Sequence, residues 1–178
     1  MTQKYTLIDV TMEYAHRTLY RIKALRDFGN VKAGDIGGWV ESYDNLSQED
    51  NCWIFDNAIV RRRAKVYRHA KICQYAKVQG DAKVRGRARV NGYATISGYA
   101  IVESSDDYIV LRNNWSSGRY FTYTRSNKMY KVGCFYGTGD ALIEKAYKDS
   151  QLSGECYKAS VLYVRMLEQA FAHNKQKQ

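Results

Sequence analysis

The 178-residue sequence contains no proline, three histidines and four cysteines. The absence of proline excludes collagen-like and proline-rich architectures and leaves the turns to Gly, Asn, Asp and Ser. The cysteines are scattered and form no CxxC pair, so the sequence predicts neither a disulfide scaffold nor a zinc site, and it carries no cofactor motif. No apolar run approaches the roughly 18 residues that would span a bilayer. The N-terminus lacks a signal-peptide pattern, so we expect a cytoplasmic protein without membrane contact.

Acidic residues are nearly absent from one segment of the chain. Residues 61–102 contain eleven basic residues and a single acid, Asp81, so this segment carries an excess equal to the net charge of the whole chain, +10. Such a density favours an anionic partner, either a small molecule or a nucleic-acid backbone. A solvated face that keeps the protein soluble is the alternative interpretation.

The same segment contains a six-residue repeat. Alanine occupies every sixth position from Ala58 to Ala100, and a β-branched aliphatic residue follows two positions later, from Val60 to Val102. A helix would scatter a six-residue period around its circumference, whereas an extended chain places residues two apart on one face. The repeat therefore predicts a coil of three flat sides with buried alanine and aliphatic side chains. Glycines mark the expected turns at Gly80, Gly86, Gly92 and Gly98.

This pattern, as in Val84-Arg85-Gly86-Arg87-Ala88-Arg89, resembles the hexapeptide-repeat family. The resemblance implies a mainly β chain with a left-handed parallel β-helix, and it implies a homotrimer. Many members are acyltransferases that activate the acceptor with a histidine between subunits. His69 is the candidate here, because His16 falls in a predicted turn and His173 in the C-terminal tail.

Three segments follow from these patterns. Residues 1–33 contain a hairpin over 5–25 that caps the solenoid, with a turn near Ala15-His16-Arg17. Residues 34–103 form the β-helix, since the same phase continues backward through Cys52, Leu46 and Val40 to Gly34. Residues 104–178 form a small α+β tail of three strands and two helices. The expected elements of this tail are strands at Tyr108–Trp115, Tyr120–Thr124 and Met129–Tyr136, and helices at Asp140–Ser150 and Glu155–His173, broken near Gly154.

The layout as a whole, with Ile-Gly-Gly-Trp-Val-Glu-Ser at 36–42 and Val-Gly-Cys-Phe-Tyr-Gly-Thr at 132–138, is similar to a group of tailed-phage and prophage accessory proteins. That resemblance implies the cytoplasm of an infected bacterium and brings no defined activity.

Residues eighteen apart lie above one another on neighbouring coils of such a solenoid, at a spacing of roughly 4.8 Å. The expected stacks are Lys65 with Lys83, Lys71 with Arg89, His69 with Arg87, Tyr75 with Tyr93, and Arg63 with Asp81 and Tyr99. Stacked like charges repel, and a bound anion would offset that repulsion. Tyrosines among guanidinium groups suit bases and phosphates, and they equally suit a subunit interface.

We therefore expect an anion to bind against the coils that bear Arg61–Arg89, in a cleft between subunits, because a single flat side offers no concavity. The candidate ligand-binding residues are Arg61, Arg63, Lys65, Tyr67, Lys71, Tyr75, Lys83, Arg85, Arg87, Arg89 and Tyr93, with lower-ranked contributions from Arg112, Trp115, Arg119 and Arg125.

The sequence lacks a nucleophile elbow, a P-loop and a dinucleotide fingerprint, so it predicts no catalytic residues. The leading hypothesis is a non-enzymatic protein that sequesters a small anionic ligand, such as a nucleotide-derived signal of host antiviral defence. The alternatives are a nucleic-acid-backbone binder, an acyltransferase that uses His69, and a structural trimer without a ligand.

Overall fold

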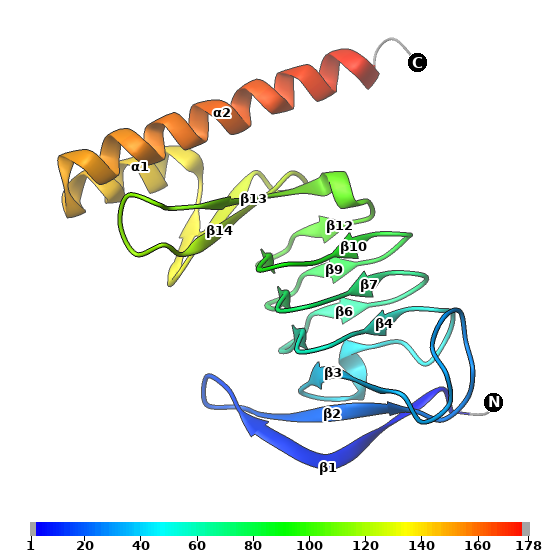
Figure 1. Cartoon of the computed structure of the whole chain (residues 1–178). Helices are drawn as coiled ribbons and strands as arrows, with labels where there is room; N and C mark the ends of the chain where they lie inside the picture. Colours follow the sequence, from blue (N-terminus) through cyan, green and yellow to red (C-terminus); the bar gives the residue numbers. More distant parts are fainter. Residues whose placement is uncertain (1–2, 176–178) are drawn as a thin grey trace. The chain divides into compact units, whose positions relative to one another are not determined.

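A computed structural model describes residues 3–175 of the chain (Figure 1). The chain divides into two compact units. The first contains the residues up to Tyr108 together with Thr124–Asn127, and the second contains Ile109–Tyr123 and the residues from Lys128 onward. Within residues 3–175, no helix is long and apolar enough to cross a membrane.

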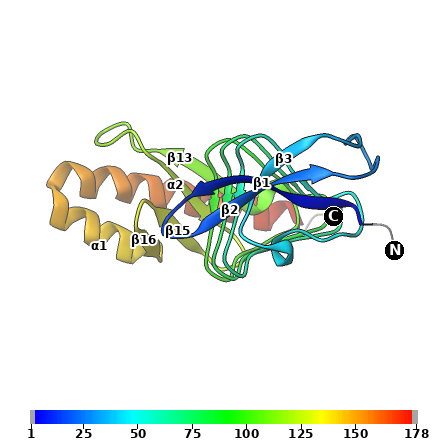
Figure 2. The same cartoon turned by 90° about the horizontal axis from the view of Figure 1, so that it is seen from below.

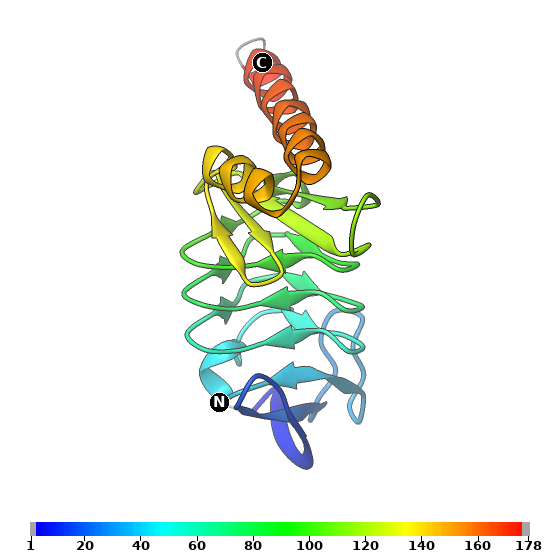
Figure 3. The same ribbon diagram turned by 90° about the vertical axis from the view of Figure 1, so that its left-hand side faces the viewer.

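The first unit is a parallel β-solenoid of about four turns, as the six-residue repeat predicts (Figures 1 and 3). Its strands pair in parallel with strands of the neighbouring coils and build three faces. The first face consists of β3 (Ile36–Val40), β5 (Ile59–Val60), β8 (Lys77–Val78) and β11 (Thr95–Ile96). The second face consists of β6 (Lys65–Val66), β9 (Lys83–Val84) and β12 (Ile101–Val102). The third face consists of β4 (Trp53–Ile54), β7 (Lys71–Ile72) and β10 (Arg89–Val90).

The alanine and aliphatic positions form the core of this solenoid. All eight alanines from Ala58 to Ala100 are completely buried, and so, within 1%, are the aliphatic residues from Val60 to Val102. The prediction for these positions is confirmed. Fully burying one such valine contributes about 1.5–3 kcal/mol, so the repeat concentrates its stabilising residues at two positions in six.

The coils turn at a position with positive φ. Gly80, Gly86, Gly92 and Gly98 adopt this conformation with φ between 64° and 73°. The equivalent positions of the lower coils carry side chains, at Asp56, Arg62, Arg68 and Gln74. Glycine populates this region freely, whereas other L-residues meet a steric penalty there.

The first coil is two residues longer than the repeat. Val40 pairs with Val60 and Leu46 with Val66, both twenty residues apart, whereas Ile54 pairs with Ile72 at the regular eighteen. We predicted that the six-residue spacing continues from Cys52 back through Leu46 and Val40. This prediction is wrong for the residues that precede Cys52. The extra residues lie between Leu46 and Ile54, so Leu46 occupies an aliphatic position and not an alanine position.

A β-hairpin covers the N-terminal end of the solenoid, as predicted (Figure 2). Strands β1 (Tyr5–Glu13) and β2 (Thr18–Ala24) are joined by a turn in which Ala15 and His16 have positive φ, and β2 pairs antiparallel with β3. The hairpin therefore continues the sheet of the first face.

Lys4 anchors this hairpin to the longer first coil. Its ammonium group is completely buried and donates hydrogen bonds to the carbonyl oxygens of Glu49 and Cys52, at 2.9 and 3.1 Å. It also lies 3.3 Å from the Cys52 Sγ. Burial lowers the pKa of Lys4 and raises that of Cys52.

The second unit contains two helices and a four-stranded sheet, except that the end residues Tyr108 and Thr124 of this sheet belong to the first unit. The sheet contains β13 (Tyr108–Arg112), β14 (Tyr120–Thr124), β15 (Met129–Val132) and β16 (Phe135–Gly137). The single strand predicted over Met129–Tyr136 is in fact two, because Gly133 adopts a positive φ of 53° and reverses the chain. The strand predicted to reach Trp115 ends at Arg112.

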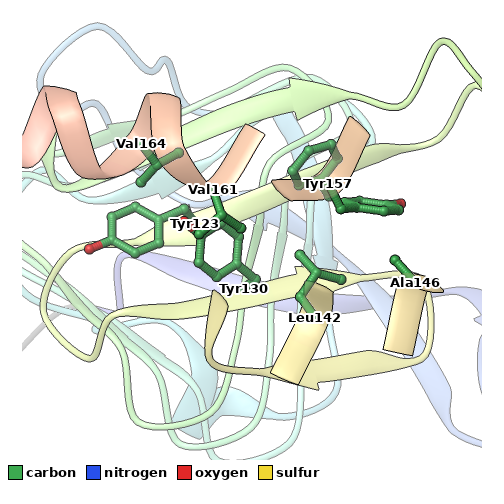
Figure 4. Close-up of a cluster of buried hydrophobic side chains, with 8 residues drawn as sticks. Tyr123, Tyr130, Leu142, Ala146, Tyr157, Val161 and Val164 are labelled. Carbon is green, nitrogen blue, oxygen red and sulfur yellow. The ribbon is translucent and has the colours of Figure 1, made fainter. Parts of the chain in front are cut away.

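Helices α1 (Gly139–Asp149) and α2 (Gln151–Lys175) are separated at Ser150, not near Gly154 as predicted. Gly154 lies inside α2, where a β-carbon would stand 2.1 Å from the Tyr147 ring, so this glycine allows the two helices to approach. The core of this unit collects Tyr123 and Tyr130 of the sheet with side chains of both helices (Figure 4). The members from the helices are Leu142, Ala146, Tyr157, Val161 and Val164.

Candidate functional site

Each two-residue strand of the solenoid presents one side chain outward and one inward. The outward position carries lysine or arginine on five consecutive strands, β6 to β10. Lys65 pairs with Lys83 on the second face, and Lys71 pairs with Arg89 on the third face. The predicted stacking of these like charges is confirmed.

The cationic side chains of the first face form contacts with other residues of the same unit. The Lys77 Nζ donates to the hydroxyl of Tyr14 at 2.8 Å. The guanidinium of Arg61 is buried, donates to the Gln79 Oε1 and lies 5.0 Å from the Tyr14 ring. Its Nη1 has no hydrogen-bond partner among the described residues. Arg61, predicted as a ligand contact, is therefore covered by the hairpin.

The third face carries the groove that we call the histidine groove. It has a volume of about 470 Å³ and is lined by Gly29, Asn30, Asn51, His69, Lys71, Arg87 and Arg89. The tight turn between Phe28 and Val31 overhangs this face, so the flat side becomes concave. The Asn30 Oδ1 accepts a hydrogen bond from the Lys71 Nζ at 2.7 Å. His69, Arg87 and Arg89 are exposed.

The second face carries a larger groove that we call the tyrosine groove. It has a volume of about 760 Å³ and is lined by Tyr43, Asp44, Leu46, Ser47, Gln48, Arg63, Lys65, Val66, Tyr67, Asp81, Lys83 and Tyr99. The 3₁₀ turn η1 (Tyr43–Asn45) replaces a flat strand in the first coil and forms one wall. The Asn45 amide holds this turn in place by donating to the carbonyl oxygens of Arg62 and Ala64, both at 2.9 Å.

These two grooves correct the expectation that a concave site requires two subunits. A single flat side offers no concavity in an ideal solenoid, but here irregular segments of the same chain overhang two of the faces. The repeat does not predict these overhangs, because both irregular segments lie outside the strict six-residue spacing.

Several predicted phosphate contacts have partners inside the fold. Arg63 forms an ion pair with Asp81 at 2.6 Å, and Arg85 forms one with Glu103 on the coil above. Each pair neutralises the arginine that was expected to hold an anion.

Tyr75 and Tyr93 stack on one another, with ring centroids 5.3 Å apart and an interplanar angle of 7°. The predicted stack is confirmed. However, neither ring lines one of the two grooves.

The lower-ranked residues of the tail do not gather around one site. The Trp115 ring packs against Phe121 and Tyr157 in the core of the second unit. The Arg112 Nε donates to the carbonyl oxygen of Gly118 in its own turn. Arg119 lines a separate pocket of about 370 Å³ in that unit, together with the exposed Cys134.

Arg125 belongs to the first unit, where its backbone N–H donates to the carbonyl oxygen of Asp107.

Residues outside the predicted ligand-binding set complete both grooves. Asn30 and Asn51 line the histidine groove, and Tyr43 and Tyr99 line the tyrosine groove. The repeat places Tyr99 in the predicted stack with Arg63 and Asp81, and the tyrosine groove contains all three, although Tyr99 was not among the predicted ligand contacts. The asparagines and Tyr43 stand in irregular segments, where no periodicity indicates a neighbour.

Neither groove contains a metal-binding cluster. No group of three or more His, Cys, Asp or Glu side chains that could hold a metal ion occurs within residues 3–175. The four cysteines are free thiols, and Cys52 and Cys73 are buried.

Comparison with known proteins gives one short match. No established protein family matches the chain. A segment of 42 residues is 52% identical to the uncharacterized acetyltransferase YdcK of Escherichia coli (strain K12). The match covers 23% of this chain and 13% of YdcK, so the chain resembles only a small part of that protein.

The histidine groove therefore combines an imidazole with three cationic side chains on one face of a hexapeptide-repeat β-helix. An imidazole can accept a proton near neutral pH, and arginine and lysine can bind phosphate.

Proposed function

We propose that this protein is an acyltransferase that binds a phosphorylated acyl donor in the histidine groove and uses His69 as its general base. The observation that carries the proposal is the position of His69 beside Lys71, Arg87 and Arg89 in one groove. The match to YdcK, which is named as an acetyltransferase, supports acyl transfer over the sequestration of a phage-type ligand.

The chemistry assigns a separate task to each kind of side chain. Acyl groups are carried as thioesters of coenzyme A, whose phosphates are anionic. Arg87 and Arg89 can hold phosphate oxygens in bidentate fashion, and Lys71 adds a point charge. The imidazole of His69 takes the proton from the acceptor hydroxyl or amine as the acceptor oxygen or nitrogen attacks the acyl carbon. The C–S bond then breaks, and the imidazolium gives the proton to the departing thiolate, so that coenzyme A leaves as the thiol.

The groove contains no carboxylate that could orient the imidazole. Its neutral polar side chains are those of Asn30 and Asn51, and the Asn30 Oδ1 already accepts from Lys71. The proposal therefore assigns the orientation of His69 to Asn51 or to a neighbouring subunit of a homotrimer.

The test is the release of coenzyme A from acetyl-coenzyme A in the presence of a panel of amines and sugar alcohols. His69→Ala should lower kcat about 10²- to 10⁴-fold, as expected for the loss of a general base. Arg87→Ala should instead raise the KM for the donor. His16→Ala is the matched control, since His16 lies in the hairpin turn. Equal turnover by His69→Ala and wild type, or no turnover with any acceptor, would contradict the proposal.

The missing carboxylate favours a second candidate function, in which the same basic groove holds a small phosphorylated ligand without converting it. A nucleotide-derived signal of host defence fits this reading, as the sequence hypothesis suggested. A thermal-shift panel of nucleotides and cyclic dinucleotides separates it from catalysis, because a sequestering protein is stabilised by its ligand and leaves it intact. A nucleic-acid-backbone binder would instead show a steep dependence of affinity on salt.

A further inference from the structure

The tyrosine groove plays no part in the proposed acyl transfer, and its lining differs from that of the histidine groove. It is the larger of the two and has rings of three tyrosines in its lining, whereas the histidine groove has none. The two grooves lie on different faces of the solenoid. They therefore suit different parts of a ligand, or different ligands.

Hydrogen bonds hold two of the three tyrosines of this lining, Tyr43 and Tyr67, in place. The Tyr43 hydroxyl accepts a hydrogen bond from the Leu7 N–H at 3.2 Å, and the Tyr67 hydroxyl accepts from the Arg85 Nη1 at 3.4 Å. Tyr99 is 75% exposed. Within residues 3–175, neither Tyr67 nor Tyr99 stacks on another aromatic ring. A planar ligand can therefore use their faces, and stacking of a base on an aromatic side chain contributes about 1–3 kcal/mol.

Two uncompensated cations stand beside these rings. Lys65 and Lys83 are paired on neighbouring strands, and in the described part of the chain neither ammonium has a hydrogen bond or an ion pair. The strand spacing of roughly 4.8 Å brings them close enough to repel. The nearby Asp81 is occupied by Arg63, at 2.6 Å, so Asp44 is the other acid of the lining. A dianionic group placed between the two lysines would relieve the repulsion.

We propose that the tyrosine groove binds a phosphate monoester joined to a flat ring, as in a nucleoside 5′-phosphate. The phosphate lies between Lys65 and Lys83, and the ring lies against Tyr67 and Tyr99. This site is independent of the proposed acyl transfer, since none of its residues lines the histidine groove.

Titration calorimetry on the full chain at low salt tests the site with four probes: AMP, phenyl phosphate, adenosine and inorganic phosphate. We expect AMP to bind at least tenfold more tightly than adenosine or inorganic phosphate, because only AMP supplies both the ring and the dianion. Equal binding by phenyl phosphate supports the site and shows that the sugar is not recognised.

Variants then locate the binding. Lys65→Gln combined with Lys83→Gln should weaken AMP at least tenfold, and Tyr99→Ala should weaken AMP but not inorganic phosphate. All three side chains are exposed, so circular dichroism should show an intact fold. Lys71→Gln is the matched control, since it removes the outward lysine of the third face.

Two results would overturn the inference. The first is the absence of AMP binding up to several millimolar. The second is a loss of AMP binding in Lys71→Gln with no loss in the Lys65 and Lys83 variant, which would assign the nucleotide to the histidine groove. A chain that binds AMP in the tyrosine groove and transfers no acyl group would refute the proposed function alone.

Discussion

The positive-φ turns of the solenoid carry two kinds of residue at one structural position. In the upper coils the position is glycine, whereas Arg62, Arg68 and Gln74 occupy it in the lower coils. Two of these three have a compensating contact. The N–H of Arg62 donates to Glu41, and the Gln74 Oε1 accepts from the Gly92 N–H at 2.7 Å. Arg68 is exposed and has no such side-chain contact in the described residues.

Arg68→Gly should therefore stabilise the first unit. The left-handed conformation costs roughly 1–2 kcal/mol for an L-residue, and the extra freedom of glycine in the unfolded chain offsets about half of that. We expect a net gain of about 0.5–1 kcal/mol, measured by urea or thermal unfolding.

Gly86→Ala is the matched control, because Gly86 occupies the same turn one coil above. Its β-carbon would stand 2.8 Å from the Glu103 carbonyl oxygen at a φ of 68°. A loss of more than about 1 kcal/mol is expected. If Arg68→Gly also lost stability, the arginine side chain would have to stabilise the turn by a contact of its own.

At the scale of the element, the close approach of α1 and α2 depends on one glycine. Gly154 is buried inside α2, and the Tyr147 ring of α1 packs directly over it. The Tyr147 hydroxyl also donates to Glu155 at 2.6 Å, which fixes the ring in this position.

Gly154→Ala should destabilise the second unit, although alanine is by about 1 kcal/mol the better helix former. The new methyl group would stand 2.1–2.5 Å from three atoms of the Tyr147 ring, so the helices would have to separate. Thermal unfolding should show a loss of about 1–3 kcal/mol. Ala159→Gly at an exposed position of α2 measures the propensity effect alone. A gain in stability for Gly154→Ala would mean that Tyr147 moves away at little cost.

The six-residue repeat made the solenoid predictable from the sequence, whereas the irregular segments of the chain could not be predicted. The burial of Ala58 and Val60 could be predicted because alanine and an aliphatic residue recur at these positions every six residues, and only an extended chain places residues at this spacing on one face. The two extra residues after Leu46 have no such marker, since a short polar stretch permits a longer turn without disturbing the spacing on either side. Gly154 was interpreted as a helix break, because its packing against Tyr147 depends on a neighbouring helix and not on local propensity.

In the candidate sites too, contacts within the repeat could be predicted and contacts with irregular segments could not. Stacked pairs such as Lys65 and Lys83 could be located from the sequence, because the repeat fixes which residues meet. The neutralisation of Arg85 by Glu103 was missed, since Glu103 stands one residue beyond the last repeat. The concavity of both grooves depends on the turns at Phe28–Val31 and Tyr43–Asn45, whose positions depend on tertiary packing.

At the scale of the whole molecule, the net charge of +10 opposes the homotrimer that the family resemblance implies. Charges on facing subunits repel, and salt screens them with a Debye length of about 10 Å at 0.1 M. Exposed tyrosines at Tyr75, Tyr93 and Tyr99 offer the residue type that is favoured at interfaces.

We expect the trimer to be favoured as ionic strength rises. Light scattering at micromolar concentration should give a mass of three times 20.6 kDa, and the trimer fraction should increase between low and moderate salt. A mass of 20.6 kDa at every salt concentration would contradict the trimer and would require all catalytic groups to come from one chain.

The eighteen-residue equivalence of the regular coils also bears on how such a gene can change. Val66 pairs with Val84, and Val84 pairs with Val102. The two edges of each regular coil therefore pair with equivalent residues of the coils before and after it. A duplication or loss of eighteen codons between these positions therefore preserves the register of the ladders, the N-terminal hairpin and the reading frame. The length of the groove-bearing faces can thus vary by copy number, while the turns that overhang the lower coils stay in place.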